Sequence, residues 1–173
     1  MPHYMVYHSC ELKQEQYQAF AAALTDLHCE LFSAPSAFVN ITFYSTYSGS
    51  AFPSTTFVGG KAHPTNFIHA HLRPRGTANA PKLRVLVETI HQLWDAHVNA
   101  SKVTTQGRLD DPNALHNVFV FEDLAAGSEQ GFILPQAGED RAWLNENIKA
   151  LEARAEQGDA SMEKLIQEMK TRF

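Results

Sequence analysis

The chain repeats one pattern twice: a short strand, an amphipathic helix and a second strand. The strands are recognised by alternation or by β-branched and aromatic residues, and the helices by apolar residues at helical spacing. In chain order, the predicted elements are a strand at 2–8, a helix at about 13–32, strands at 38–45 and 66–73, a helix from about 81 to 99 and a strand at 117–122.

This repetition restricts the fold to an α/β class. A strand–helix–strand crossover is right-handed and makes its two strands parallel. Two tandem β-α-β units therefore predict a four-stranded sheet covered by two helices on one face. The other face must be buried as well, most simply against another subunit, so we expect an oligomer.

Two further segments differ from the repeats. Residues 46–64 are rich in Ser, Gly and Pro and predict a loop, with a short hairpin arm at Phe57 and Val58. Residues 139–173 are rich in Glu, Lys, Gln and Ala, with apolar residues in two helical runs that meet near Gly158. We therefore expect one domain at 1–138 and a C-terminal helical extension at 139–173.

Composition excludes several classes of protein. The formal net charge of -5 gives no reason to expect a nucleic-acid partner. No apolar run approaches the roughly 20 residues of a membrane helix, and no signal peptide is visible. The two cysteines, Cys10 and Cys29, have neither CxxC nor metal-like spacing. We expect a cytoplasmic protein that binds neither nucleic acid nor membrane and uses no cofactor.

The segment FIHAHLRPRG at 67–76 is the most informative for chemistry. On a strand, its side chains alternate between an apolar face and a polar face. The apolar face receives Ile68, Ala70 and Leu72, and the polar face receives His69, His71 and Arg73, with Arg75 as a continuation. The two arginines favour an anion site, because a guanidinium binds a carboxylate through two N–H groups. The alternative is a salt-bridged surface at a subunit contact.

The two histidines of this segment raise a metal hypothesis. His69 and His71 lie on one face, two residues apart, which could place both on one ion. No third ligand of clear spacing accompanies them, so we expect no metal.

Three other residues could carry chemistry. His28 lies on the apolar stripe of the first helix, where a buried core or interface histidine is the simplest interpretation. Glu129 follows the last strand in a polar turn, where a solvated role is the simplest. Once Met1 is removed, Pro2 carries a secondary amine that can act as a base when neutral and as an acid when protonated.

Four segments together resemble the tautomerase superfamily, in particular its cis-3-chloroacrylic acid dehalogenase branch. These segments are MPHYMVYHS at the start, LTDLH at 24–28, FIHAHLRPRG at 67–76 and GFILPQAG at 131–138. The resemblance covers most of residues 2–138. It implies that Pro2 is the catalytic proline, that Glu129 activates water, and that His28 and Arg73 bind the substrate carboxylate. It also implies a homotrimer.

The chain departs from the family pattern at two places. The second carboxylate-binding arginine of the family lies three residues after the first, where this chain has Gly76, and Arg75 lies one residue earlier. A family tyrosine of the last core strand is replaced by Phe119, or by Phe121 in a shifted alignment. Neither phenylalanine has a hydroxyl to position water, which argues against efficient dehalogenation.

The preferred functional hypothesis is an enzyme that uses Pro2 for keto–enol tautomerisation of a small unsaturated or 2-oxo carboxylic acid. One alternative is a hydratase, dehalogenase or decarboxylase of a three-carbon acid. Another is a non-catalytic oligomer that binds a metabolite in the arginine pocket.

Overall fold

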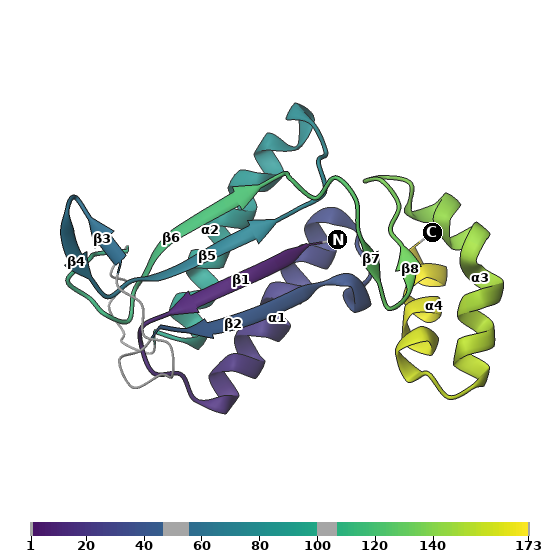
Figure 1. The fold of residues 1–173 in the computed structure, drawn as a ribbon, viewed down its shortest axis with the longest axis horizontal. Helices are drawn as coiled ribbons and strands as arrows, with labels where there is room; N and C mark the ends of the chain where they lie inside the picture. The colour runs from purple at the N-terminus through teal and green to yellow at the C-terminus, as the bar shows by residue number, and fades with distance from the viewer. Residues whose placement is uncertain (1, 47–55, 100–106, 173) are drawn as a thin grey trace.

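The computed structural model describes residues 2–46, 56–99 and 107–172. Its centre is a four-stranded sheet in the order β2-β1-β5-β6 (Figure 1). The strands are β1 (His3–His8), β2 (Asn40–Ser45), β5 (Asn66–His71) and β6 (Leu115–Phe121). β1 and β2 are parallel, as are β5 and β6, whereas β1 and β5 run antiparallel. The predicted tandem β-α-β sheet is confirmed.

Two helices, α1 (Gln14–Phe32) and α2 (Ala80–His97), cover one face of the sheet, behind the strands in Figure 1. Gln16 connects them, because its side-chain amide donates to the carbonyls of His97 and Val98 at 3.3 and 3.0 Å. The predicted strand at 38–45 begins later than expected. Residues Ser36–Phe38 form a 3₁₀ turn, η1, and β2 starts at Asn40.

The main core lies between these helices and the sheet. Alternate strand residues point into it, as the predicted periodicity requires: Tyr4 and Val6 of β1 and Ile68 and Ala70 of β5 are fully buried. The helices contribute large buried side chains that include Phe20, Leu24, Leu86, Ile90 and Trp94. The strand patterning therefore assigned the core face correctly.

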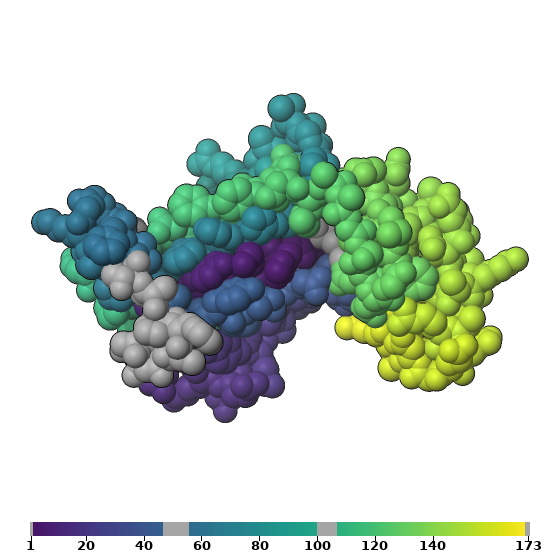
Figure 2. Space-filling model, viewed as in Figure 1, coloured from purple at the N-terminus to yellow at the C-terminus, as the bar shows by residue number. Residues whose placement is uncertain are grey.

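The opposite face of the sheet is open within one chain (Figure 2). Aromatic and histidine rings cross all four strands there, with centroids 4.5 to 6.4 Å apart. The members of this aromatic face are Tyr7, Tyr44, Phe67, His69, His71, Phe119 and Phe121. Phe119 is 50% exposed. A face of this composition is typical of a surface that another subunit covers.

Two small hairpins extend from the sheet. β3 (Thr56–Val58) pairs with β4 (Lys61–His63), which confirms the arm at Phe57 and Val58, although the predicted loop at 46–64 lies partly outside the described residues. β7 (Ser128–Glu129) pairs with β8 (Phe132–Ile133), where the sequence had indicated only a polar turn.

The C-terminal helices form a second packed unit. α3 (Asp140–Glu156) and α4 (Ala160–Arg172) lie side by side beyond the end of the sheet where β1 begins (Figure 1). Gly158 has φ +92° in the turn between them, a conformation that glycine adopts without strain. Their cluster of buried side chains is separate from the main core but includes Phe38 of η1. The domain division at 138 and 139 stays a prediction.

Within the described residues, no helix is long and apolar enough to cross a membrane. The cytoplasmic location stays a prediction.

The carboxylate of Glu168 on α4 docks the extension onto the body, since it accepts from the backbone N–H and hydroxyl of Ser36 at 2.6 and 2.5 Å. We expect Glu168→Ala to lower the free energy of unfolding by about 1.5–3 kcal/mol, the range for hydrogen bonds to a charged group. Urea denaturation measures this. Glu163→Ala on the same helix, an exposed position, is the control and should cost less than half as much. Equal losses would contradict the docking role.

Candidate active site

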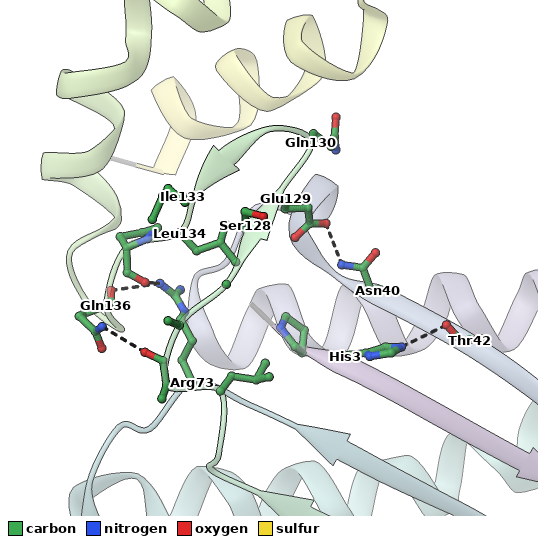
Figure 3. A pocket seen from close by; sticks show the side chains of 16 residues that line it. His3, Asn40, Thr42, Arg73, Ser128, Glu129, Gln130, Ile133, Leu134 and Gln136 are labelled. Atoms are coloured by element: carbon green, nitrogen blue, oxygen red, sulfur yellow. Dashed lines mark hydrogen bonds between the residues drawn. The ribbon is translucent and has the colours of Figure 1, made fainter.

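A cavity of about 560 Å³ lies beside the start of β1 (Figure 3). A volume of this size suits a small organic ligand. Strands β1 and β2 and the residue before β1 contribute four lining residues: Pro2, His3, Asn40 and Thr42. Arg73, which lies just beyond the end of β5, is a fifth. The rest of the wall is the segment 124–130, which carries Glu129, and the segment 133–136. Side chains far apart in sequence therefore meet here.

Pro2 directly precedes β1 and is buried. Its carbonyl accepts a hydrogen bond from the backbone N–H of Asn40 at 3.2 Å. A proline is well placed at the start of a strand, because it has no N–H to offer to the ladder. Pro2 lines the cavity together with Arg73 and Glu129. Met1 lies outside the described residues.

Glu129 is held by one side chain from the sheet. The Asn40 amide donates to its Oε1 at 2.7 Å (Figure 3), while Oε2 is buried and has no hydrogen-bond partner among the described residues. Burial raises the pKa of Glu129 above its ordinary value, although the Asn40 hydrogen bond acts in the opposite direction. The carboxyl group therefore holds a proton more readily than an exposed glutamate does.

Arg73 is only 5% exposed and is already engaged within the chain. Its Nη1 donates to the carbonyls of Pro135 and Gln136 at 2.8 and 3.0 Å, and its Nη2 pairs with Asp140 at 3.0 Å. The Nε–H has no partner among the described residues. The salt bridge of this arginine therefore forms inside the chain, and three of its five N–H groups have the partners named above.

His28 lies in the core, 2% exposed, rather than on the cavity wall. Its Nδ1 is 2.8 Å from the Tyr4 hydroxyl, and its Nε2 has no partner among the described residues. Burial, together with the positive charges of Arg75 and Arg73, lowers the pKa of His28 to about 2. The imidazole is therefore neutral, and it lies close enough to both arginines to respond to their charges.

Two other predicted residues lie outside the cavity lining of one chain. The Arg75 guanidinium carbon is 4.8 Å from the centroid of the Phe32 ring, and its backbone N–H donates to Glu122 at 2.8 Å. Phe119 lies on the aromatic face, paired across the ladder with His69. The structure thus brings together Pro2, Arg73 and Glu129, while the assigned roles of all these residues stay predictions.

Sequence reasoning missed Asn40 and Asp140. Asn40 falls within the predicted strand at 38–45, where a lone amide in the apolar run FVNITF is a usable signal. Asp140 resembles any acidic residue in the first turn of a helix. No local pattern indicates that it pairs with an arginine 67 residues earlier.

The metal hypothesis finds no support in the described part of the chain, where no group of three or more potential ligands converges. His71 instead pairs with Asp123, with Nδ1 2.9 Å from the carboxylate.

Comparison with known families decides the chain's membership. The Tautomerase_3 family model, described as a putative oxalocrotonate tautomerase enzyme, matches residues 1–148. The chain belongs to this family. No curated protein matches the sequence significantly.

Solved structures share the fold of this Tautomerase_3 chain. N1, a member of the cis-3-chloroacrylic acid dehalogenase family, is 24% identical, with a TM-score of 0.63 over 90% of this chain and 99% of its own. A fused 4-OT symmetric trimer is 16% identical, with a TM-score of 0.54 over 79% of this chain and 98% of its own. MIF2 of Leishmania major is 12% identical, with a TM-score of 0.52 over 78% of this chain and 97% of its own. At these identities the likeness establishes the fold alone.

The neutral state of His28 has a consequence for stability. Because its pKa is about 2 in the folded chain and 6.5 in the unfolded chain, only the unfolded chain binds a proton there as the pH falls below 6.5. Between pH 7.5 and pH 5.0, this histidine should lower the free energy of unfolding by about 2 kcal/mol. Urea denaturation of wild type and His28→Gln at both pH values measures the effect. The same pH dependence in both proteins would contradict it.

Proposed function

We propose that this family member catalyses keto–enol tautomerisation of a small unsaturated or 2-oxo carboxylic acid, with Pro2 as the proton carrier. The observation that carries the proposal is that Pro2, Arg73 and Glu129 line one cavity. Membership of a family described as a putative tautomerase supports it.

The substrate carboxylate is assigned to the arginine side of the cavity. The unpartnered Nε–H of Arg73 supplies one donor, and the predicted contributions of His28 and Arg75 supply the others. With the carboxylate held, the Pro2 nitrogen removes the enol proton and returns it to carbon. The rigid φ of proline limits the directions in which its nitrogen can deliver that proton.

The charge around the amine decides which form of Pro2 is present. Asp140 offsets the charge of Arg73 at 3.0 Å, which weakens the effect of that arginine on a nearby amine. An ionised Glu129 on the same wall favours the protonated amine. Because burial raises the pKa of Glu129, the carboxyl is more readily neutral than an exposed glutamate, and a neutral carboxyl leaves Pro2 free to act as a base.

A second candidate reaction is addition of water to an unsaturated acid. The buried Oε2 of Glu129 has no partner among the described residues and can accept a proton from water, while Asn40 holds the other oxygen. Protonated Pro2 then supplies the proton that enters the α-carbon. Both reactions use one cavity but require opposite protonation states of Pro2. A binding protein without catalysis is the remaining alternative.

We further propose that the active form is a homotrimer. The aromatic face is exposed in one chain, and two similar structures are described as fused 4-OT trimers. Phe119 lies on this face, two strands away from β1, so we expect it to approach a proline site from a neighbouring subunit.

Pro2→Ala tests the proposed reaction. After intact mass establishes that Met1 is absent, we expect kcat/KM for the enol of phenylpyruvate to fall by about 10²–10⁴, the usual contribution of a positioned acid or base. Thr42→Val, which changes another residue of the cavity wall, is the matched control and should retain activity.

The same pair of variants is assayed on acetylenic and halogenated three-carbon acids. If Pro2→Ala loses activity only on these acids and keeps enol conversion, water addition is the favoured reaction instead. Retention of Met1, or equal rates for wild type and Pro2→Ala on every substrate, would leave only the binding protein.

The trimer is tested by sedimentation velocity. The particle mass obtained for wild type should be about three times the chain mass of 19.3 kDa. Tyr44→Asp places a charge on the aromatic face and should dissociate the assembly, because an unpaired charge buried at an interface is strongly unfavourable. Val85→Asp, at a 44% exposed position on α2, is the control and should remain trimeric. A monomeric wild type would refute the proposal.

A further inference from the structure

The hairpin that carries Glu129 is too small to hold its own position. β7 and β8 have two residues each, with Glu129 opposite Phe132. An isolated two-stranded hairpin is marginally stable at best. The orientation of the Glu129 carboxyl therefore depends on what holds the hairpin from outside.

The turn of this hairpin has a conformation that needs support. Gln130 and Gly131, which follow Glu129, both have positive φ, 49° and 88°. The common two-residue hairpin turn requires this geometry, but it favours Asn or Gly at the first position. A residue such as glutamine rarely adopts it.

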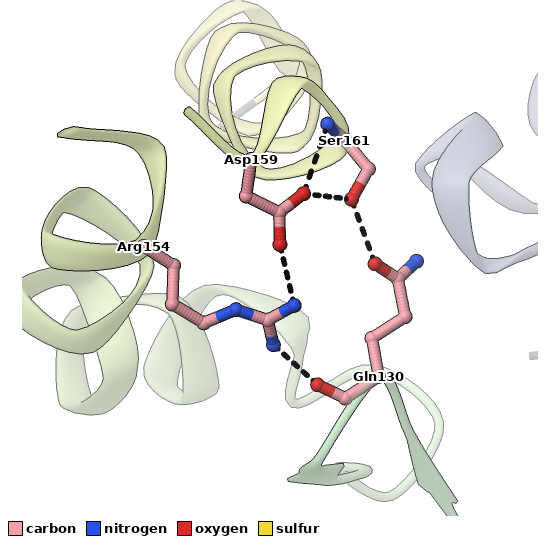
Figure 4. Close-up of polar contacts among 4 residues, drawn as sticks. All are labelled: Gln130, Arg154, Asp159 and Ser161. Atoms are coloured by element: carbon pink, nitrogen blue, oxygen red, sulfur yellow. Dashed lines mark hydrogen bonds and ion pairs between the residues drawn. The ribbon is translucent and has the colours of Figure 1, made fainter. Parts of the chain in front are cut away.

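The C-terminal helices supply that support (Figure 4). Arg154, near the end of α3, donates through Nη1 to the carbonyl of Gln130 and through Nη2 to Asp159 at 2.5 Å. The Ser161 hydroxyl lies 2.8 Å from Oε1 of Gln130 and 2.6 Å from Oδ1 of Asp159, and its single hydrogen serves one of these acceptors at a time. The backbone and the side chain of Gln130 thus both contact the extension.

The back of the hairpin packs on α3 as well. The Phe132 ring lies 5.9 Å from Trp143 between centroids and 5.5 Å from the guanidinium carbon of Arg154. Trp143 Nε1 donates to the carbonyl of Ile133 at 2.7 Å. Both residues of β8 therefore contact α3, on the strand opposite Glu129.

We propose that Arg154 is a positioning residue for Glu129 and acts through the carbonyl of Gln130. The C-terminal helical extension would then contribute to the active site by fixing the position of the Glu129 carboxyl. This inference rests on the proposed role of Glu129. Arg154 and Ser161 lie beyond residues 1–148, the part that matches the family model.

The test compares full-length Arg154→Met with Arg141→Met, an exposed arginine on the same helix. Methionine replaces the apolar stem of the arginine with an unbranched chain but has no N–H group to donate. The first readout is the titration of the Glu129 carboxyl carbon by ¹³C NMR, which needs no activity. Release of the hairpin exposes the carboxyl more fully to bulk water, so the pKa of Glu129 should fall towards its ordinary value in Arg154→Met and stay as in wild type in Arg141→Met.

The second readout is the ratio of the two reactions. In Arg154→Met, kcat for water addition to an acetylenic three-carbon acid should fall by about 10- to 100-fold, as a small misplacement of a catalytic group can cause. Enol conversion by Pro2 should fall by less than water addition does, because Glu129 affects it only through the charge that its carboxylate places near the amine. Arg154→Lys, which retains the charge but carries its donors on a single nitrogen, should recover part of the loss.

Thermal denaturation accompanies each variant, and Ser161→Ala gives a milder change should Arg154→Met fold poorly. Ser161→Ala should move the Glu129 titration in the same direction by a smaller amount. An unchanged titration in Arg154→Met, or equal losses in both reactions together with a lower melting temperature, would overturn the positioning role. If wild type catalyses neither reaction, the proposed function fails, whereas the titration still decides the inference.

Discussion

The buried guanidinium of Arg73 is the interaction on which the site depends most. Transferring its charge out of water costs several kcal/mol, and the Asp140 carboxylate and two backbone carbonyls offset that cost. These partners connect the end of β5 to the segment at 133–136 and to the first turn of α3. Since Arg73, Pro135 and Gln136 line the same cavity, the cavity wall and the ion pair form together. A carboxylate bound there must share an arginine that is already paired.

The cavity is assembled from two units with separate cores. The sheet and its helices contribute Pro2 and Asn40, whereas the hairpin that carries Glu129 packs against the C-terminal helices. The Asn40–Glu129 hydrogen bond joins the two units at the cavity. Pro2, the proposed proton carrier, and the Glu129 carboxyl thus line one cavity although they come from different units.

Much of the fold was predictable because it follows from local periodicity. The alternation at 66–73 correctly placed Ile68 and Ala70 in the core and His69 on the open face. Element boundaries and short connecting segments were less predictable. The 3₁₀ turn η1 replaced the expected start of β2, and a hairpin replaced the expected turn around Glu129. Such short elements are stabilised by contacts with distant segments, such as Ser36 with Glu168, rather than by their own sequence.

The sequence by itself determined the order of strands and helices along the chain, the buried face of each, and the residue types available for proton transfer. These features depend on the spacing of residues that are close together in the chain. Only the tertiary structure decided which of those residues meet. Arg73 finds its partners 62 to 67 residues away, and Glu129 is held by an amide 89 residues earlier. The physical reason is that charge pairing and burial depend on distances in space. The packing of the whole chain sets these distances, and a local sequence pattern does not contain them.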